Sequence, residues 1–312
     1  MCGRYASARS RIELLEEFEV QRDRVDEPLE PDYNVAPTKP VYAVMTRQRR
    51  SDRASNAEDG RAGASRGADV RPDAERKEPD ETGGERPAAM RELRVVRWGL
   101  VPAWAKDVSI GSRLINARAE TVSEKPAFRG AFARRRCLLP ADGYYEWQAP
   151  PAGTKGRKQP YYICRLDRGP LAFAGVYELW RDRSVAGDDP AAWLWTSAII
   201  TTTAPDELGE IHDRMPMVID PASWADWLDP ANSEVADVRS LLVPAAATGL
   251  TSYPVSLAVN SVRNNGPRLI EKASPADLAG AMPPPTLDIT PESKLSGSDL
   301  TDLVYRYYQV RA

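Results

Sequence analysis

The sequence has few of the residues that build metal sites and disulfide frameworks. It contains one histidine and three cysteines, Cys2, Cys137 and Cys164, and no pair of cysteines has CxxC spacing. An odd number of widely spaced cysteines favours neither a disulfide framework nor a zinc site. No apolar run is long enough to span a bilayer, and no signal peptide opens the chain. We therefore expect a cytoplasmic protein with no metal and no membrane partner.

The sequence also lacks a strong excess of charge of either sign. Its formal net charge is only −3 over 312 residues. The chain as a whole therefore does not resemble a nucleic-acid-binding protein, although a local basic groove remains open. Its basic residues are mainly arginine, which suits bidentate phosphate contacts but is also what a biased genome composition produces.

The pattern of strands and helices has no regular βαβ rhythm, which favours an α+β fold with a largely antiparallel sheet. We expect a single domain with a barrel-like β core flanked by helices, over residues 1–272. Residues 47–91 are charged and nearly empty of large apolar side chains, which is typical of a disordered insertion. Residues 273–312 are polar and Pro-rich and predict an extended tail.

Local patterns place the individual elements within this domain. The predicted helices cover residues 10–20, 128–132, 205–211, 221–228 and 235–242. The predicted strands cover residues 41–45, 93–102, 171–179, 193–202, 217–219 and 253–262, with a hairpin over 142–164. Residues 33–38 are polar and contain a proline, which predicts a loop.

The most unusual chemistry in the sequence lies at Cys2, directly after Met1. Removal of Met1 would leave a free amine and a thiol on one residue. These groups titrate near ~7.7–8.0 and ~8.5, so both have reactive fractions at neutral pH. The amine can form a Schiff base with an aldehyde, and the thiol can then close a thiazolidine ring. Cys2 is therefore a candidate covalent nucleophile, against the alternative that Met1 stays in place.

Other candidate residues each have a structural alternative. His212 is a candidate proton-transfer group, although a lone histidine is more often structural. Glu146 lies between two aromatic residues, where burial would raise its pKa, unless strand alternation turns it to solvent. Asn116 and Arg118 share one strand face and could hold a nucleophile and a phosphate. Trp98 could stack on a base, although a core tryptophan is the commoner case.

Six motifs in a fixed order are more specific than any of these residues alone. They are Met1–Tyr5, Tyr33–Thr38, Arg97–Ala105, Asn116–Thr121, Arg136–Trp147 and Ile211–Pro216. In this combination the sequence resembles the SOS response-associated peptidase (SRAP) family, the abasic-site processing proteins. The resemblance runs from Met1 to about Asn265, interrupted by the insertion at 47–91.

The resemblance implies a DNA-repair activity in the response to DNA damage. Such a protein would bind single-stranded DNA that contains abasic sites. It would link Cys2 to the aldehyde of the ring-opened sugar as a thiazolidine, without any cofactor. The resemblance also implies autocatalytic removal of Met1, which makes the protein a thiol autopeptidase, with lyase activity as an extension.

The resemblance assigns roles residue by residue. Glu146 and His212 correspond to the family's proton-transfer residues, and Asn116 to the residue that positions Cys2. The expected DNA-binding residues are Arg4, Arg118, Arg214, Trp98 and Pro40.

Three alternatives remain open at this stage. Met1-Cys2-Gly3 also opens the N-terminal-nucleophile glutamine amidotransferases, although Arg4 and Tyr5 replace their expected apolar strand. A non-catalytic single-strand binding module would use the same arginines and tryptophans. A protease that cleaves other proteins would use Cys2, His212 and Glu146. Nothing in the sequence requires more than a monomer.

Overall fold

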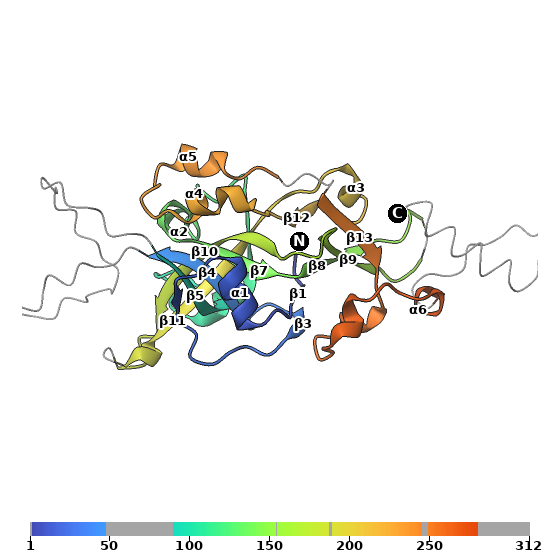
Figure 1. Ribbon diagram of the computed structural model, residues 1–312, viewed down its shortest axis with the longest axis horizontal. Coiled ribbons are helices and arrows are strands. Elements are labelled where there is room, and N and C mark those ends of the chain that lie inside the picture. Colours follow the sequence, from blue (N-terminus) through green and yellow to red (C-terminus); the bar gives the residue numbers. More distant parts are fainter. Residues whose placement is uncertain (1, 48–89, 154, 187–188, 245–248, 280–312) are drawn as a thin grey trace, which may run out of the picture.

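The computed structural model describes residues 2–47, 90–153, 155–186, 189–244 and 249–279 (Figure 1). The strands are β1 (Tyr5–Ser7), β2 (Arg22–Asp23), β3 (Asp32–Val35), β4 (Pro40–Arg47), β5 (Met90–Trp98), β6 (Asn116–Arg118), β7 (Arg136–Ala141), β8 (Gly143–Gln148), β9 (Gln159–Arg165), β10 (Leu171–Arg181), β11 (Trp193–Thr203), β12 (Arg214–Pro216) and β13 (Leu250–Pro254). The α-helices are α1 (Arg11–Glu17), α2 (Arg129–Arg134), α3 (Asp206–Gly209), α4 (Trp224–Leu228), α5 (Val235–Ser240) and α6 (Pro275–Ala279). The 3-10 segments are η1 (Val108–Arg113), η2 (Pro190–Ala192), η3 (Pro221–Ser223), η5 (Leu257–Asn260) and η6 (Pro267–Ile270).

Five long strands form a closed barrel in the order β11-β10-β7-β4-β5. The neighbours within this series pair antiparallel. The ring closes because β5 pairs with β11 in parallel, with Arg97 opposite Thr196 and Trp98 opposite Ser197. Closure leaves no free edge between β5 and β11, and the interior of so small a barrel is filled by side chains.

Alternate residues of the barrel strands divide into two buried clusters. The outer cluster contains Tyr42, Leu138 and Ile200 and is covered by α1, α2, α4 and α5, which lie around the barrel in Figure 1. The inner cluster contains Met45, Phe173 and Ile199, together with residues of the amino-terminal segment. Two-residue alternation therefore gives each strand one face for the helices and one for the barrel interior.

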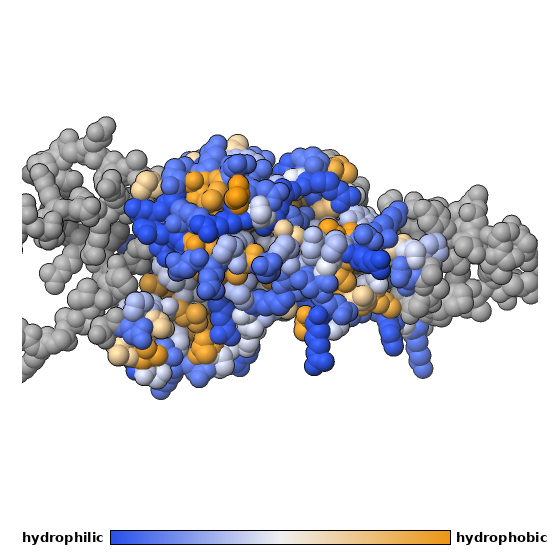
Figure 2. Space-filling model, turned by 60° about the horizontal axis from the view of Figure 1, so that its bottom comes forward, coloured by the Kyte–Doolittle hydropathy of each residue, from blue (hydrophilic) through white to orange (hydrophobic). Residues whose placement is uncertain are grey.

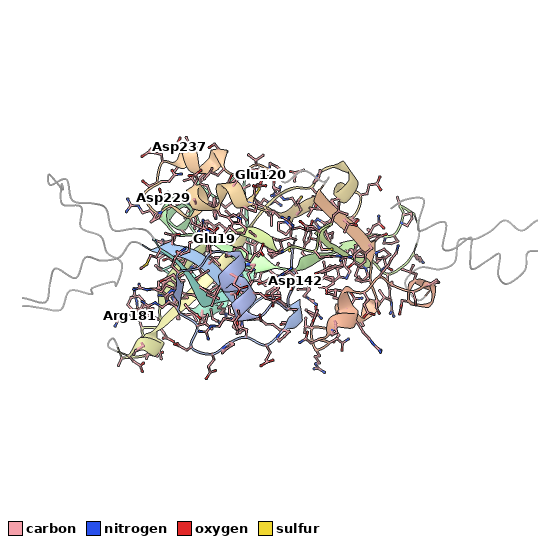
Figure 3. All side chains as sticks on the ribbon, viewed as in Figure 1. Glu19, Glu120, Asp142, Arg181, Asp229 and Asp237 are labelled. Carbon is pink, nitrogen blue, oxygen red and sulfur yellow. The ribbon has the colours of Figure 1, made fainter. Side chains whose placement is uncertain are left out.

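The second sheet has the order β13-β9-β8-β1-β3 and continues from the barrel through the turn between β7 and β8. The short strand β1 lies inside it, between β8 and β3. Asp142, labelled in Figure 3, fixes the chain just after β1: its carboxylate accepts a hydrogen bond from Ala8 N at 2.6 Å and pairs with Arg9 Nε at 3.0 Å. The amino-terminal segment is thereby held at one mouth of the barrel.

A buried arginine joins the barrel to its helical cover. The guanidinium of Arg136 donates hydrogen bonds to the carbonyl oxygens of Phe132, Ala133, Trp227, Asp229 and Asn232. Its side chain is only 3% exposed, and burial lowers its pKa to about 10. It therefore stays charged at neutral pH and connects β7 to α2 and α4.

A glycine shapes the loop that leaves the barrel after β5. Gly99 has φ +127°, and a Cβ at this position would lie 2.6 Å from the carbonyl oxygen of Gly111. Any other residue would therefore be strained by both its backbone angle and this contact. The loop carries Trp104, which is 61% exposed.

The predicted α+β class with a mostly antiparallel, barrel-like core is confirmed. Several local predictions were wrong. Residues 32–35 form β3 rather than a loop, because they pair with β1. The strand predicted at 217–219 lies at Arg214–Pro216, and the one predicted at 253–262 ends at Pro254, where η5 follows. The start of the predicted tail contains α6.

Two predicted regions fall largely outside the described residues: the charged insertion, of which 48–89 are not described, and the tail beyond residue 279.

The face of the molecule in Figure 2 is mainly hydrophilic, and its hydrophobic patches are small and separate. Among the described helices, none is long and apolar enough to cross a membrane.

Candidate functional site

Cys2 lies at the mouth of the barrel and is fully buried, in contact with the inner cluster. Its thiol approaches the carbonyl oxygen of Arg4 at 3.9 Å. Burial raises the pKa of the Cys2 thiol well above its usual value, and the nearby carboxyl of Glu146 raises it further. The thiol of the folded chain is therefore protonated at neutral pH.

Asn116 connects Cys2 to the barrel wall. Its strand β6 runs parallel to β11, with Asn116 opposite Ile199, which directs it to the inner cluster. Asn116 Nδ2 donates a hydrogen bond of 2.7 Å to the carbonyl oxygen of Cys2. Its other amide atom, Oδ1, is buried and has no hydrogen-bond partner among the described residues. An acceptor is thus available beside the backbone of Cys2.

Glu146 is buried in β8, with only 4% of its surface exposed. The alternative of a solvent-facing Glu146 is therefore excluded. Burial raises the pKa of Glu146 to about 7, and the charge of Asp213 adds to this effect. The positive charges of the amino terminus and Lys158 oppose it. A carboxyl group with a pKa near neutrality can both give and accept a proton at physiological pH.

His212 and Glu146 line the same narrow cleft, together with Tyr144 and Arg214. His212 follows α3, where its backbone N–H closes the helical turn on Leu208. Its side chain is 27% exposed, and burial together with the charge of the amino terminus lowers its pKa. The structure therefore brings the two sequence-predicted proton-transfer residues to one cleft beside the amino-terminal segment.

Arg214 is held by protein groups in this structure. Its guanidinium makes a bidentate pair with Glu120, at 2.6 and 3.0 Å, and donates to the carbonyl oxygen of Thr201 at 2.6 Å. Glu120, labelled in Figure 3, is half exposed, whereas the side chain of Arg214 is only 11% exposed. A phosphate at this position would therefore meet an arginine already neutralised by a carboxylate.

Arg4 is joined to a residue that sequence reasoning missed. Its Nη1 donates to Asn34 Oδ1 at 2.7 Å and to the carbonyl oxygen of Val259 at 2.9 Å. The buried amide of Asn34 also donates to the carbonyl oxygens of Val259, Ser261 and Asn264. Asn34 therefore ties Arg4 to the loop after β13. The only signal in the sequence was its place in the Tyr33–Thr38 motif.

For Trp98 the structure favours the alternative of a core tryptophan over a DNA contact. Its side chain is fully buried, its Nε1 donates to the carbonyl oxygen of Ile115 at 3.0 Å, and its ring packs edge-on against Tyr5. Neither face of the indole is available to a base. Trp104, six residues later, has the exposed indole that such a role requires.

The two remaining DNA-binding candidates lie at strand ends. Arg118 ends β6 and is exposed, two residues from Asn116. Pro40 begins β4 and is exposed opposite Arg97.

Within the described part of the chain, no group of three or more His, Cys, Asp or Glu residues could hold a metal ion.

Cys2 is buried at the mouth of a closed barrel, beside a cleft lined by the carboxyl of Glu146 and the imidazole of His212. These features define a class of barrel protein whose candidate nucleophile is residue 2. Residues 1–262 match the SOS response associated peptidase (SRAP) family, and the chain belongs to this family. The resemblance found in the sequence motifs is thereby confirmed.

Two relatives show how far the similarity extends. The chain is 34% identical over 271 residues to the abasic site processing protein YoqW of Bacillus subtilis (strain 168), covering 87% of this chain and 99% of YoqW. It is 32% identical over 203 residues to the abasic site processing protein HMCES of Gallus gallus, covering 58% of this chain and 57% of HMCES.

Solved structures share the fold. A protein from Bacteroides thetaiotaomicron aligns with a TM-score of 0.62 at 25% identity, over 88% of this chain and 100% of that protein. A phage-related protein from Bordetella bronchiseptica aligns with a TM-score of 0.51 at 26% identity, over 81% of this chain and 94% of that protein.

Proposed function

We propose that this protein processes abasic sites in single-stranded DNA by forming a covalent bond through Cys2. The observation that carries the proposal is the meeting of four groups at one barrel mouth. Asn116 holds the carbonyl group of Cys2, and Glu146 and His212 line one cleft. Burial raises the pKa of the Cys2 thiol, and the charge of Glu146 adds to this effect.

The first step is hydrolysis of the Met1–Cys2 peptide bond, which consumes one water and frees the amine of Cys2. The new amine would lie next to the buried Oδ1 of Asn116, which can accept one of its N–H groups. The site can then fix both the carbonyl and the amine of Cys2 through one side chain, so the nucleophile is oriented before DNA binds.

The buried thiol sets the order of the next steps. Because it is protonated at rest, the amine is the better nucleophile and attacks C1′ of the ring-opened sugar first. The carbinolamine then takes a proton from Glu146 or His212 and loses water to give a Schiff base. The Schiff base formed in this way is protonated on nitrogen. The thiol of Cys2 adds to the same carbon, and the thiol proton returns to the residue that donated one, so the ring nitrogen keeps the single N–H of the amine. One aldehyde and one aminothiol thus give a thiazolidine and one water.

DNA binding would use the arginines around this mouth. Arg118 is exposed next to Asn116, and Arg4 keeps its Nη2 free of protein hydrogen bonds among the described residues. The exposed indole of Trp104 offers a face on which a base can stack. These contacts are local, which is consistent with the weak overall charge of the chain.

The proposal is tested by intact mass, before and after incubation with a single-stranded oligonucleotide that carries one abasic site. We expect a chain that lacks Met1 and gains the oligonucleotide mass less one water, in an adduct that survives denaturation. Cys2→Ala should form no adduct, whereas Cys137→Ala and Cys164→Ala, which replace the other two buried cysteines, should react normally.

The other outcomes separate the rival functions. An adduct that reverses on denaturation unless reduced would limit the chemistry to the Schiff base. Fully salt-dissociable binding would indicate a non-catalytic binding module. A chain without Met1 that forms no adduct would redirect the search to amide substrates, including glutamine and peptides.

A further inference from the structure

One ring nitrogen of His212 faces two partners that cannot both be satisfied. The backbone N–H of Arg214 lies 3.0 Å from Nδ1, and Asp213 Oδ1 lies 2.9 Å from the same nitrogen. The N–H group can donate only to a bare Nδ1, whereas the carboxylate can accept only from a protonated Nδ1. The neutral ring therefore carries its proton on Nε2, and the charged ring donates Nδ1–H to Asp213.

The other charged groups around the ring come from several elements. Glu146 on β8 and Arg214 on β12 line the same cleft as His212, and Lys158 precedes β9. Burial, the amino terminus and Lys158 all disfavour the charged ring, whereas Asp213 favours it. Asp213 is also the carboxylate in direct contact with Nδ1.

We propose that Asp213 is a positioning residue that holds the charged ring of His212 through Nδ1–H, so that Nε2 exchanges protons with a molecule in the cleft. The arrangement has two states. In the resting state the Arg214 amide fixes Nδ1 as an acceptor. In the working state Asp213 accepts Nδ1–H, which leaves Nε2–H as the group that the ring can give away.

The catalytic consequence rests on the proposed function, although the two-state ring does not. The charged ring transfers its Nε2 proton to the hydroxyl oxygen of the carbinolamine, which leaves as water. The ring that remains is a transient neutral form, with its Nδ1–H still on Asp213, and is distinct from the resting Nε2–H form. A proton from solvent restores Nε2–H, or loss of Nδ1–H with protonation of Nε2 returns the ring to the Arg214 amide.

The chain has a single histidine, so nuclear magnetic resonance of protein labelled with nitrogen-15 at histidine observes this ring alone. We expect the neutral form to be the Nε2–H tautomer. Asp213→Asn should lower the pKa of His212 by about 0.2–0.7 pH units, the range expected for an exposed ion pair. The matched control is Glu210→Gln, which removes an exposed negative charge two residues away and should shift the pKa much less.

High salt adds a second test. It screens Asp213 as well as the amino terminus and Lys158, so the informative quantity is the difference in His212 pKa between the parent protein and Asp213→Asn, which should shrink as the ionic strength rises. A resting neutral ring protonated on Nδ1, or equal pKa shifts in Asp213→Asn and Glu210→Gln, would overturn the proposal. The same holds for a pKa difference between the two proteins that salt does not reduce.

The pH profile of adduct formation links this inference to the reaction. The limb of the profile that reports the charged ring should move to lower pH in Asp213→Asn by the shift seen in the spectra. A spectroscopic shift without any adduct in the parent protein would leave the role of Asp213 intact and refute the proposed function. A normal adduct with an unmoved profile would refute the role of Asp213 alone.

Discussion

Replacing Glu146 with glutamine separates the effect of this residue on stability from its proposed part in the reaction. Burial raises the pKa of Glu146 from 4.5 to about 7. An acid with a raised pKa in the folded state keeps its proton there after the unfolded chain has lost it. Its cost to folding is therefore absent below pH ~4.5, grows as the pH rises to about 7, and persists in full above that.

The size of the cost follows from the shift. A difference of about 2.5 pH units, at about 1.36 kcal/mol per unit, amounts to about 3 kcal/mol at pH 8. Glutamine has nearly the same shape and no charge, so it avoids this cost. We expect Glu146→Gln to be more stable than the parent by up to about 3 kcal/mol at pH 8, or on the order of 5–10 °C in melting temperature.

The assay is thermal unfolding of both proteins at pH 5, 6, 7 and 8, with single-turnover adduct formation measured on the same samples. The stability gain should vanish toward pH 5, whereas adduct formation should be slow throughout. Glu210→Gln, at an exposed site, is the matched control and should show no such pH dependence. A gain that is the same at pH 5 and pH 8, or a loss of stability at pH 8, would refute the reasoning.

Three further changes test other contacts. Asn116→Ala removes the hydrogen bond to the Cys2 carbonyl. Single-turnover kinetics should show adduct formation slowed by about 10–100-fold in a folded protein. An unchanged rate would remove Asn116 from the site. Glu120→Gln leaves Arg214 with an uncompensated charge. Fluorescence anisotropy should show about 2–5-fold tighter binding of single-stranded DNA. Weaker binding would mean that Glu120 instead orients Arg214. Arg136→Met leaves five carbonyl groups without their donor. Urea denaturation should show a loss of about 3–5 kcal/mol in the free energy of unfolding. An unchanged free energy of unfolding would contradict the connecting role of this residue.

The sequence predicted a barrel-like core but not which two strands close it. Alternation and β-branched runs identify β4, β10 and β11 because these signals are local. The parallel contact between Trp98 and Ser197 joins segments about one hundred residues apart and leaves no local pattern. β3 was predicted as a loop for the same reason, since its polar residues are ordered by pairing with β1.

For the candidate site, motif order identified the candidate residues but not their surroundings. Cys2, Asn116, Glu146 and His212 were all selected from the sequence, and the structure places them at one mouth. The burial of Trp98 could not be predicted, because a motif does not show which of its tryptophans is buried. The role of Asn34 was missed because its Nδ2 donates to backbone carbonyl groups and its Oδ1 accepts from Arg4, thirty residues away in the sequence, and neither contact leaves a local pattern.

The closed barrel also determines when during protein synthesis the site can exist. Asn116 follows Cys2 by 114 residues, and His212 is made later still. At about 5–20 residues per second, a ribosome needs roughly 10–40 s to advance from Cys2 to His212. Throughout that interval the start of the nascent chain lacks the barrel wall that later encloses it. An aminopeptidase near the ribosome therefore has access to the start of the chain before folding buries Cys2.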